Sequence, residues 1–145
     1  MSHIAKYNFT LAPALRDFIE WQLEYYHDNK RQLNSFKENM IPSQISQYGH
    51  KAGSSFDSEK RPTEDITIRR NPEYIMEQER IINAIESVLT KLSESDMEII
   101  RLKYWSGELT PDGIALMLNI DKSTLYYRLN NIMVEIARRL GLVNI

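Results

Sequence analysis

The sequence predicts an all-α protein in which a long N-terminal helix and a second long helix, paired as a hairpin or coiled-coil-like, precede a C-terminal helix-turn-helix domain. Three observations support this fold class: two long stretches with apolar residues at helical spacing, a polar stretch between them, and a closing series of short helices marked by caps and turn residues. We expect four segments, namely an N-terminal helical segment over 1–41, a polar linker over 42–71, a connecting long helix over 72–92 and a helix-turn-helix domain over 93–145.

A partly ordered lead-in over 1–12 is expected before the first helix, in which Pro13 suits the first turn. Apolar residues then recur at helical spacing, or at multiples of it, at Leu15, Ile19, Leu23, Tyr26, Leu33, Phe36 and Met40. The stripe predicts one helix of about seven turns. Such a helix cannot bury its stripe alone, so it requires a second long helix from this chain or from another copy.

The stretch over 42–71 is rich in Pro, Ser, Gly, Gln and charged residues. It offers few apolar groups to offset the entropy of ordering it, so we interpret it as a flexible or loosely packed linker. Its basic residues offer an alternative interpretation as contacts to a DNA backbone: Lys60, Arg61, Arg69 and Arg70.

The second long helix is expected to begin near Pro72 and to continue to Leu92. Its apolar residues follow an a/d pattern at Ile75, Ile82, Ile85, Leu89 and Leu92. Its partner is either the first helix, folded back as an antiparallel hairpin, or the same helix of a second subunit. The sequence leaves both arrangements open.

A third helix is expected to begin after Ser93 or Ser95, because serine is a good N-cap. Asp96 and Glu98 then lie in the first turn, where the helix dipole favours negative charge. The apolar face of this helix continues to a stop near Gly107, and it would form the scaffold beneath the two helices that follow.

Two helices joined by a tight turn are predicted between Leu109 and Leu129. Thr110 is a good N-cap for a helix from Pro111 to Leu118, in which small Ala115 lies where two helices approach closely. Asn119 suits a left-handed turn position. Asp121 is expected to cap the next helix, which buries Leu125 and Leu129 and continues to Gly141.

The outer face of this last helix is polar and aromatic, with Lys122, Ser123, Tyr126, Tyr127 and Asn130 on it and Arg128 at its border. A short turn followed by such a face is typical of a helix-turn-helix recognition helix that enters the major groove of DNA. The alternative is an ordinary two-helix corner with a solvated face. We expect one of the two tyrosines to pack inward, against Trp105 or the N-terminal helix.

The composition restricts the function classes. The chain has 145 residues, with 42% hydrophobic and 26% charged residues and no cysteine, which excludes disulfides and thiolate metal sites. Its three histidines lack ligand spacing, and no phosphate loop or catalytic constellation is present, so we expect neither an enzyme nor a cofactor or metal. Without an apolar run or signal peptide, we expect a cytoplasmic protein with no membrane partner.

The net charge of −2 is unusual for a protein that binds nucleic acid. The part from Arg101 onward carries six basic and four acidic residues, whereas the part before it carries twelve and sixteen. The asymmetry has the expected direction but is weak. Phosphate contacts alone would therefore give modest affinity, and we expect dimerisation or a protein partner to contribute.

The segment LSESDMEIIRLKYWSGELTPDGIALMLNIDKSTLYYRLNNIMVEIARRLGL resembles the C-terminal part of RinA- and ArpU-type phage transcriptional regulators, whose helix-turn-helix is similar to region 4 of sigma factors. The resemblance is carried by Leu102-Lys103-Tyr104-Trp105, Gly113-Ile114-Ala115, Leu118-Asn119-Ile120, Ile136-Ala137 and Leu140-Gly141-Leu142. The stretch LAPALRDFIEWQLEYYHDNKRQL resembles the opening helix of the family, and the polar stretch that ends in Pro62-Thr63-Glu64 is also similar.

The resemblance implies a sequence-specific DNA-binding regulator of a phage or prophage that activates late packaging and structural genes in the cytoplasm of a bacterial host. The implied partner is double-stranded DNA. From the weak charge asymmetry and the long apolar stripes we also expect a homodimer, with RNA polymerase as a further candidate partner. The implied base-reading residues are Ser123, Tyr126 and Tyr127, and the implied phosphate contacts are Lys122, Arg128 and Asn131. The chain departs from the family where Asp121 replaces the usual serine and where tyrosines replace basic residues or tryptophan, so the specificity of relatives does not transfer.

Two other functions remain open from the sequence. One is a phage DNA-packaging adaptor similar to small terminase proteins, although the order of helix-turn-helix and oligomerisation segment would be reversed. A ring-forming mass in solution would favour it, whereas a monomer or dimer would favour regulation. The other is a protein-interaction module with a vestigial helix-turn-helix, supported by the acidic balance alone.

Overall fold

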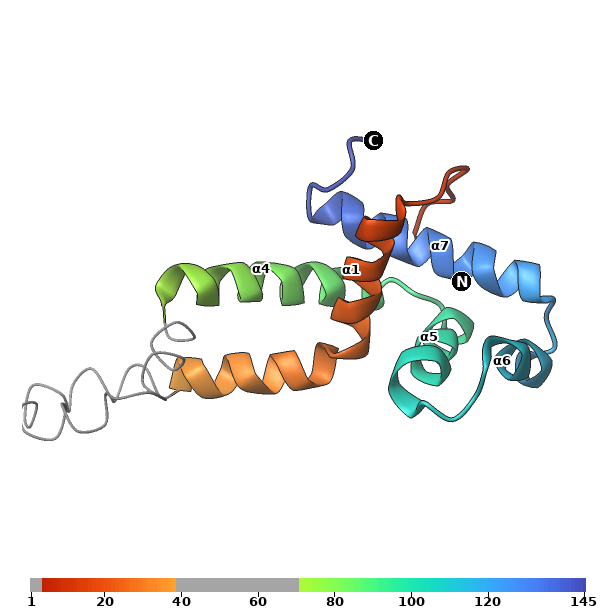
Figure 1. Ribbon diagram of the computed structural model, residues 1–145, viewed down its shortest axis with the longest axis horizontal. Coiled ribbons are helices and arrows are strands. Elements are labelled where there is room, and N and C mark those ends of the chain that lie inside the picture. Colours follow the sequence, from red (N-terminus) through yellow and green to blue (C-terminus); the bar gives the residue numbers. More distant parts are fainter. Residues whose placement is uncertain (1–3, 39–70) are drawn as a thin grey trace, which may run out of the picture. The chain divides into compact units, whose positions relative to one another are not determined.

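Every regular element that the computed structural model describes, in residues 4–38 and 71–145, is a helix (Figure 1). In chain order the elements are α1 (Pro13–Glu24), α4 (Pro72–Leu89), α5 (Glu94–Ile100), the π-helix η1 (Arg101–Ser106), α6 (Pro111–Leu118) and α7 (Lys122–Arg139). Helical backbone also runs from 26 to 38. The predicted all-α class is confirmed for these residues. Apart from its last residue, the predicted linker lies outside them, as do the four basic residues named within it.

The described residues divide into two compact units, and the division crosses α4 between Ile82 and Asn83. The first unit contains residues 4–26 and 83–145, and the second contains 27–38 and 71–82. This division differs from the four segments expected from the sequence, because α1 belongs to the same unit as the C-terminal helices.

The first helix is shorter than the sequence predicts. It ends at Glu24, Tyr25 follows with φ −99° and ψ 16°, and helical backbone resumes at 26. The Leu23 carbonyl, just before the break, accepts a 2.9 Å hydrogen bond from the indole Nε1 of Trp105. A side chain that bonds a helix carbonyl disturbs the regular ladder, which gives a physical reason for the break. The apolar spacing continues through Tyr25, so the sequence pattern does not reveal it.

α4 begins at Pro72, as predicted, and ends at Leu89, before the predicted end at Leu92. Within the second unit, its first half lies beside the helical residues 27–38 (Figure 1). Lys37 Nζ is 2.7 Å from Glu79 Oε2, and both side chains are exposed, so this ion pair contributes little stability. Leu33 and Ile75 supply buried apolar surface in the same unit.

The core of the first unit is built around α7, which contacts α1, α5 and α6. Its second half is buried on all sides, since every residue from Asn131 to Ala137 is buried. A helix segment whose side chains are apolar on every face, or are polar with hydrogen-bond partners, is typical of the centre of a fold. The largest fully buried side chains of this core come from all five α-helices of the unit, and none comes from η1: Ile19, Leu23, Ile85, Val88, Ile99, Ile100, Ile114, Leu125, Leu129, Ile132, Met133 and Ile136.

The third predicted helix is two elements. α5 begins after Ser93, whose Oγ accepts a 3.1 Å hydrogen bond from the Asp96 amide, as the capping prediction requires. It then widens into η1, which stops at Gly107 in the left-handed region with φ 69°. The helix start and stop were predictable from these two residues, but the π-helical winding was not.

The π-helix η1 presents its side chains to α1. The Tyr104 hydroxyl donates to Glu20 Oε2 at 2.9 Å, and Lys103 Nζ lies 3.8 Å from the same oxygen. Burial, together with the charge of Glu20, raises the pKa of Tyr104, so its hydroxyl stays protonated and remains a donor. Trp105 stacks on Tyr26 with ring centroids 5.9 Å apart. The contacts of η1 with Glu20 and Leu23 hold α1 in the first unit, where α1 also packs against α7.

Candidate nucleic-acid interface

A three-residue connection, 119–121, joins α6 to α7 at the candidate interface. Asn119 adopts the left-handed region with φ 57° and ψ 47°, which asparagine tolerates better than most residues. The next amide, from Ile120, donates 3.0 Å to the Ala115 carbonyl, and this bond closes the end of α6. The ranges expected for the first helix and for the start of the second are those of α6 and α7.

Of the residues expected to build this corner, Ala115, Leu125 and Leu129 lie in its interior, whereas Asn119 is exposed in the turn. Ala115 is buried in α6, where its small side chain allows close approach, and Thr110 caps the helix by accepting a 3.2 Å hydrogen bond from the Gly113 amide. Leu125 and Leu129 are fully buried on α7. The corner therefore has a fixed geometry, set by packing on one side and by the Asn119 turn on the other.

The first half of α7 presents an exposed face. Ser123 is exposed, and so are Tyr126 and Tyr127, at 37% and 46%. The expectation that one of these tyrosines packs inward is wrong. Trp105, one of the partners considered for it, stacks on Tyr26 instead.

The charge of this face is favourable to an anionic partner. From Lys122 to Val134, α7 contains no acidic residue, although the chain as a whole is acidic. Lys122 is exposed and pairs with Asp112 of α6, with 3.0 Å between Nζ and Oδ1. The hydrogen bond to Asp112 raises the pKa of Lys122 above its ordinary value. An exposed pair of this kind is weak and can exchange Asp112 for a phosphate.

Whereas Asp112, the partner of Lys122, is exposed, Arg128 pairs with a buried carboxylate. Its Nη2 lies 2.6 Å from Asp96 Oδ1, its Nε donates to the same oxygen, and Nη2 also donates to Ser95 Oγ at 2.7 Å. Asp96 is buried, and removing Arg128 would leave its carboxylate without this partner. We therefore remove Arg128 from the expected phosphate contacts and assign it to the attachment of α5 to α7.

Asn131 is also placed differently from the expectation. Its side chain is only 6% exposed, and its Oδ1 accepts a 2.9 Å hydrogen bond from the Tyr7 amide. A buried side chain that already satisfies a backbone donor is not available to a phosphate. We remove Asn131 from the interface for this reason.

Asp121 precedes α7, as expected for an N-cap, but its side chain makes no capping hydrogen bond. It remains exposed at the end of the helix. Its negative charge still interacts favourably with the dipole of α7 at the N-terminal end, although it would repel an approaching phosphate.

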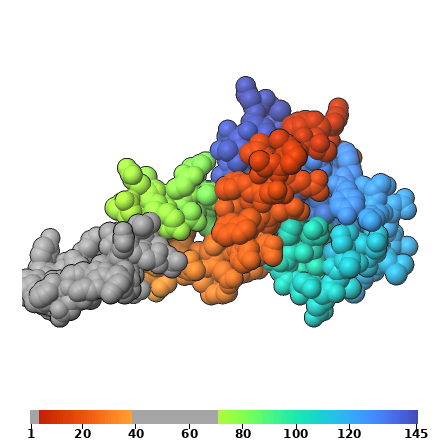
Figure 2. Space-filling model, viewed as in Figure 1, coloured from red at the N-terminus to blue at the C-terminus, as the bar shows by residue number. Residues whose placement is uncertain are grey.

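The N-terminal segment adds a wall that the sequence pattern did not predict. Residues from Tyr7 to Thr10 run beside α7 and, with it, border a groove of about 620 Å³. In Figures 1 and 2 this segment and the start of α1, in red, lie against α7, in blue. The groove is lined by Tyr7, Asn8, Phe9, Thr10, Arg16, Ser123, Tyr126, Tyr127 and Asn130. Lead-in residues carry no helical periodicity, so only the contacts in the fold could identify them.

Hydrogen bonds fix this segment to α7. Besides the bond to Asn131, the Tyr7 hydroxyl donates to the buried Glu135, and Asn130 Nδ2 donates to the Phe9 carbonyl at 2.8 Å. Glu135 also pairs with Arg138, with 2.6 Å between Oε2 and Nη2. Burial works to raise the pKa of Glu135, but the hydrogen bonds from Arg138 and Tyr7 and the nearby arginine charges outweigh it and lower the pKa below its ordinary value of 4.5. The carboxylate is thus ionised at neutral pH and anchors the segment.

The described ranges also bear on metal sites and membrane spans. Residues 4–38 and 71–145 contain no group of three or more His, Asp or Glu side chains that could hold a metal ion. No helix in these ranges is long and apolar enough to cross a membrane. Comparisons with protein-family models, curated proteins and solved structures gave no match to the chain.

Proposed function

We propose that the chain is a sequence-specific DNA-binding regulator in which α6, the Asn119 turn and α7 form a helix-turn-helix. The observation that carries the proposal is the exposed, acid-free first half of α7, held at a fixed angle by a buried second half. A rigid helix that leaves a polar and aromatic face uncovered suits the major groove, which admits one α-helix.

The side chains on this face offer the chemistry of base and phosphate recognition. Ser123 can donate to a base edge, and Tyr126 and Tyr127 can contact a thymine methyl or donate a hydrogen bond from their hydroxyls. Lys122, at the start of the helix, can replace its exposed partner Asp112 by a phosphate. Because Arg128 and Asn131 are bonded within the chain, α7 offers fewer phosphate contacts than the resemblance implies.

A phage or prophage promoter as the target and activation of late genes follow from the resemblance to RinA- and ArpU-type regulators, and RNA polymerase is a further candidate partner of such a regulator. We retain them as part of the proposal. The small number of cations on the face supports a second copy of the chain or a protein partner, because one recognition helix with few phosphate contacts gives modest affinity. In the second unit, the side-by-side helices favour a hairpin within one chain, which leaves dimerisation to other surfaces.

The test begins with selection of bound sequences from a pool of duplex DNA with a randomised centre, at low salt. The selected duplex is then titrated by fluorescence anisotropy against the wild type, Ser123→Ala and Tyr127→Ala. We expect enrichment of a defined sequence, and about a tenfold or greater loss of affinity for Tyr127→Ala because the variant loses a specific base contact. Circular dichroism and thermal melting confirm that each variant is folded.

Tyr74→Ala is the matched control. Tyr74 is as exposed as Tyr126, at 37%, but lies in α4. It should leave the affinity unchanged. Absence of any enriched sequence at low salt would overturn the proposal and favour the alternative function, a protein-interaction module with a vestigial helix-turn-helix. Sedimentation of the same sample as a large ring would instead favour a packaging adaptor.

A further inference from the structure

The groove between the N-terminal segment and α7 is chemically unlike the rest of this acidic protein. Of the described residues that line it, Arg16 alone carries a formal charge. The others are tyrosine, phenylalanine, asparagine, serine and threonine, which offer hydroxyl and amide groups between aromatic rings. A groove of this composition suits an anionic partner with a sugar or aromatic part.

Arg16 is the one cation among the described residues that line the groove. It forms no ion pair with a described residue, and its helical neighbour at the fourth position, Glu20, is engaged with Tyr104 and Lys103 of η1. Its side chain is half-buried against the fold, so less of its freedom is lost when it binds. A half-buried guanidinium that lines a polar groove and forms no ion pair within the described ranges is well suited to bind a phosphate.

The opposite wall of the groove is fixed in place. The Tyr7 amide and hydroxyl bond Asn131 and Glu135, and the Phe9 carbonyl accepts from Asn130. Tyr7 and Phe9 also meet edge to face, with ring centroids 6.1 Å apart. The segment is therefore part of the rigid surface that α7 presents, and a partner that reaches Tyr126 and Tyr127 meets it as well.

We propose that this groove is a second DNA contact, in which Arg16 of α1 binds a backbone phosphate that flanks the bases contacted by Tyr126 and Tyr127. Residues from Asn8 to Thr10 border the adjoining sugar. This inference rests on the proposed function and names a contact that comes from outside the helix-turn-helix. Arg16 also adds a cation to the surface that would face DNA, where Arg128 is not available because it pairs with Asp96.

The experiment compares wild type, Arg16→Ala and Arg16→Lys on the duplex selected above, by anisotropy over a range of salt. Arg16→Ala should weaken binding about three- to tenfold for selected and scrambled duplexes alike. The negative slope of log K against log salt should become less steep by about 0.9, the value of one phosphate contact. Arg16→Lys should keep the slope, because it keeps the charge. Arg101→Ala, which removes an exposed charge paired with Glu98, is the matched control and should behave as wild type.

A second measurement locates the phosphate. Single neutral methylphosphonates are placed along the selected duplex. One position should weaken binding of the wild type but not further weaken Arg16→Ala, and it should flank the bases at which Tyr127→Ala changes selectivity.

The outcomes separate the two proposals. If the wild type selects a sequence and Tyr127→Ala loses it, while Arg16→Ala keeps both affinity and salt slope, the groove contact is wrong and the proposed function stands. A weakened Arg16→Ala with an unchanged slope and no matching methylphosphonate position also overturns it, because the effect is then structural. Failure of the wild type to bind any duplex removes both proposals.

Discussion

The two halves of α7 differ in how much of each is buried. In the half that begins at Lys122, Leu125 and Leu129 are buried and the tyrosines between them are exposed. In the half from Asn131 to Ala137 every residue is buried, including two polar ones. One continuous helix thus serves as a surface at one end and as the centre of the core at the other.

This difference explains how a short exposed face is held rigidly. An isolated helix of two turns is unstable in water, and its side chains would have no defined position. Here the exposed turns continue a helix whose second half is packed on all sides, and the hydrogen bonds at Asn131 and Glu135 fix the N-terminal segment as well. Changes in the buried half should therefore affect stability, and changes at the exposed side chains of the first half, such as Ser123, Tyr126 and Tyr127, should affect binding alone.

The largest expected effect is that of Ile136→Ala in the buried half. Ile136 is fully buried, so the truncation removes apolar contacts and leaves a cavity, at a cost of about 2–5 kcal/mol in the free energy of unfolding. Urea denaturation followed by circular dichroism measures it. Ile136→Val, the matched control, should cost about 0.5–1.5 kcal/mol. A cost for alanine no larger than that for valine would contradict the central position of this half.

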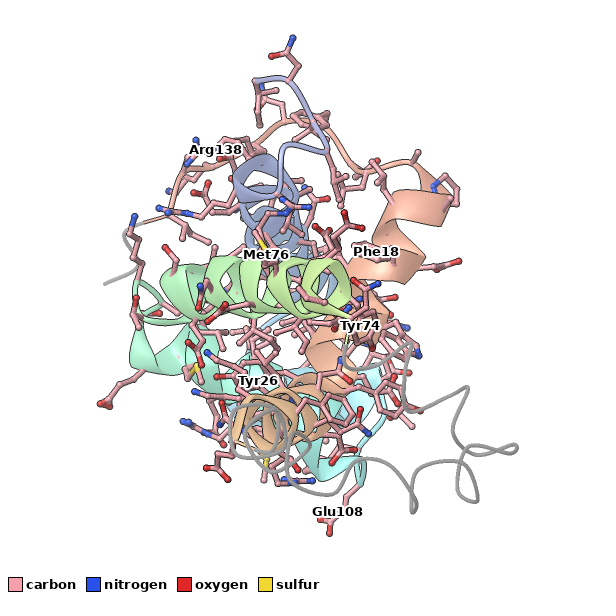
Figure 3. All side chains as sticks on the ribbon, turned by 90° about the vertical axis from the view of Figure 1, so that its left-hand side faces the viewer. Phe18, Tyr26, Tyr74, Met76, Glu108 and Arg138 are labelled. Atoms are coloured by element: carbon pink, nitrogen blue, oxygen red, sulfur yellow. The ribbon has the colours of Figure 1, made fainter. Side chains whose placement is uncertain are left out.

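The second effect is that of Glu135→Gln, which removes the charge that anchors Tyr7 and Arg138. We expect a loss of about 1–3 kcal/mol in the free energy of unfolding at neutral pH. Glu108→Gln, at a residue that projects from the loop after η1 (Figure 3), is the control and should be nearly neutral. Equal stability of the two variants would show that Glu135 does not anchor the segment.

The effect of Glu135→Gln should depend on pH. The pKa of Glu135 is lower in the folded chain than its ordinary value of 4.5, so its stabilisation is fully present above that value and is lost as the pH falls through the folded pKa. The stability difference between wild type and variant should therefore be constant from neutral pH to about 5 and shrink in more acidic solution. A difference that grows on acidification would reverse the assigned sign.

The predictable parts of the molecule are those encoded by local chemistry. Thr110 and Pro111 mark the start of α6, Asn119 ends it, and Gly141 follows α7 with φ 75°, as a helix stop requires. Each signal acts within a few residues of its own position. The helix ends around the candidate interface could therefore be predicted from the sequence.

The parts that could not be predicted depend on contacts between distant residues. The break at Tyr25 accompanies the bond from Trp105 to Leu23, and the loss of Arg128 from the interface follows from its bond to Asp96. The place of the N-terminal segment depends on the bond of Tyr7 to Asn131. Helical spacing predicts which face is apolar, but it does not tell which distant polar group a side chain meets.

The third effect concerns the helix that supports the exposed half. Thr110→Ala removes the hydroxyl that caps α6 and should cost about 1 kcal/mol in the free energy of unfolding, with Thr110→Ser nearly neutral because it keeps the acceptor. Chemical denaturation measures both. A loss for serine as large as that for alanine would assign the effect to the missing methyl group instead of the cap.

The smallest effect on stability is expected at the start of the exposed half, for Asp121→Asn. Asp121 makes no capping hydrogen bond, and asparagine is as good an N-cap, so the free energy of unfolding should change by no more than about 0.5 kcal/mol. Affinity for the selected duplex should rise about two- to threefold at low salt, because a negative charge next to the phosphates is removed, and the gain should fade as salt increases. Anisotropy titrations at two salt concentrations measure it. Weaker binding at unchanged stability would mean that the carboxylate accepts a hydrogen bond from a base, and the boundary between the two halves of α7 would then carry specificity.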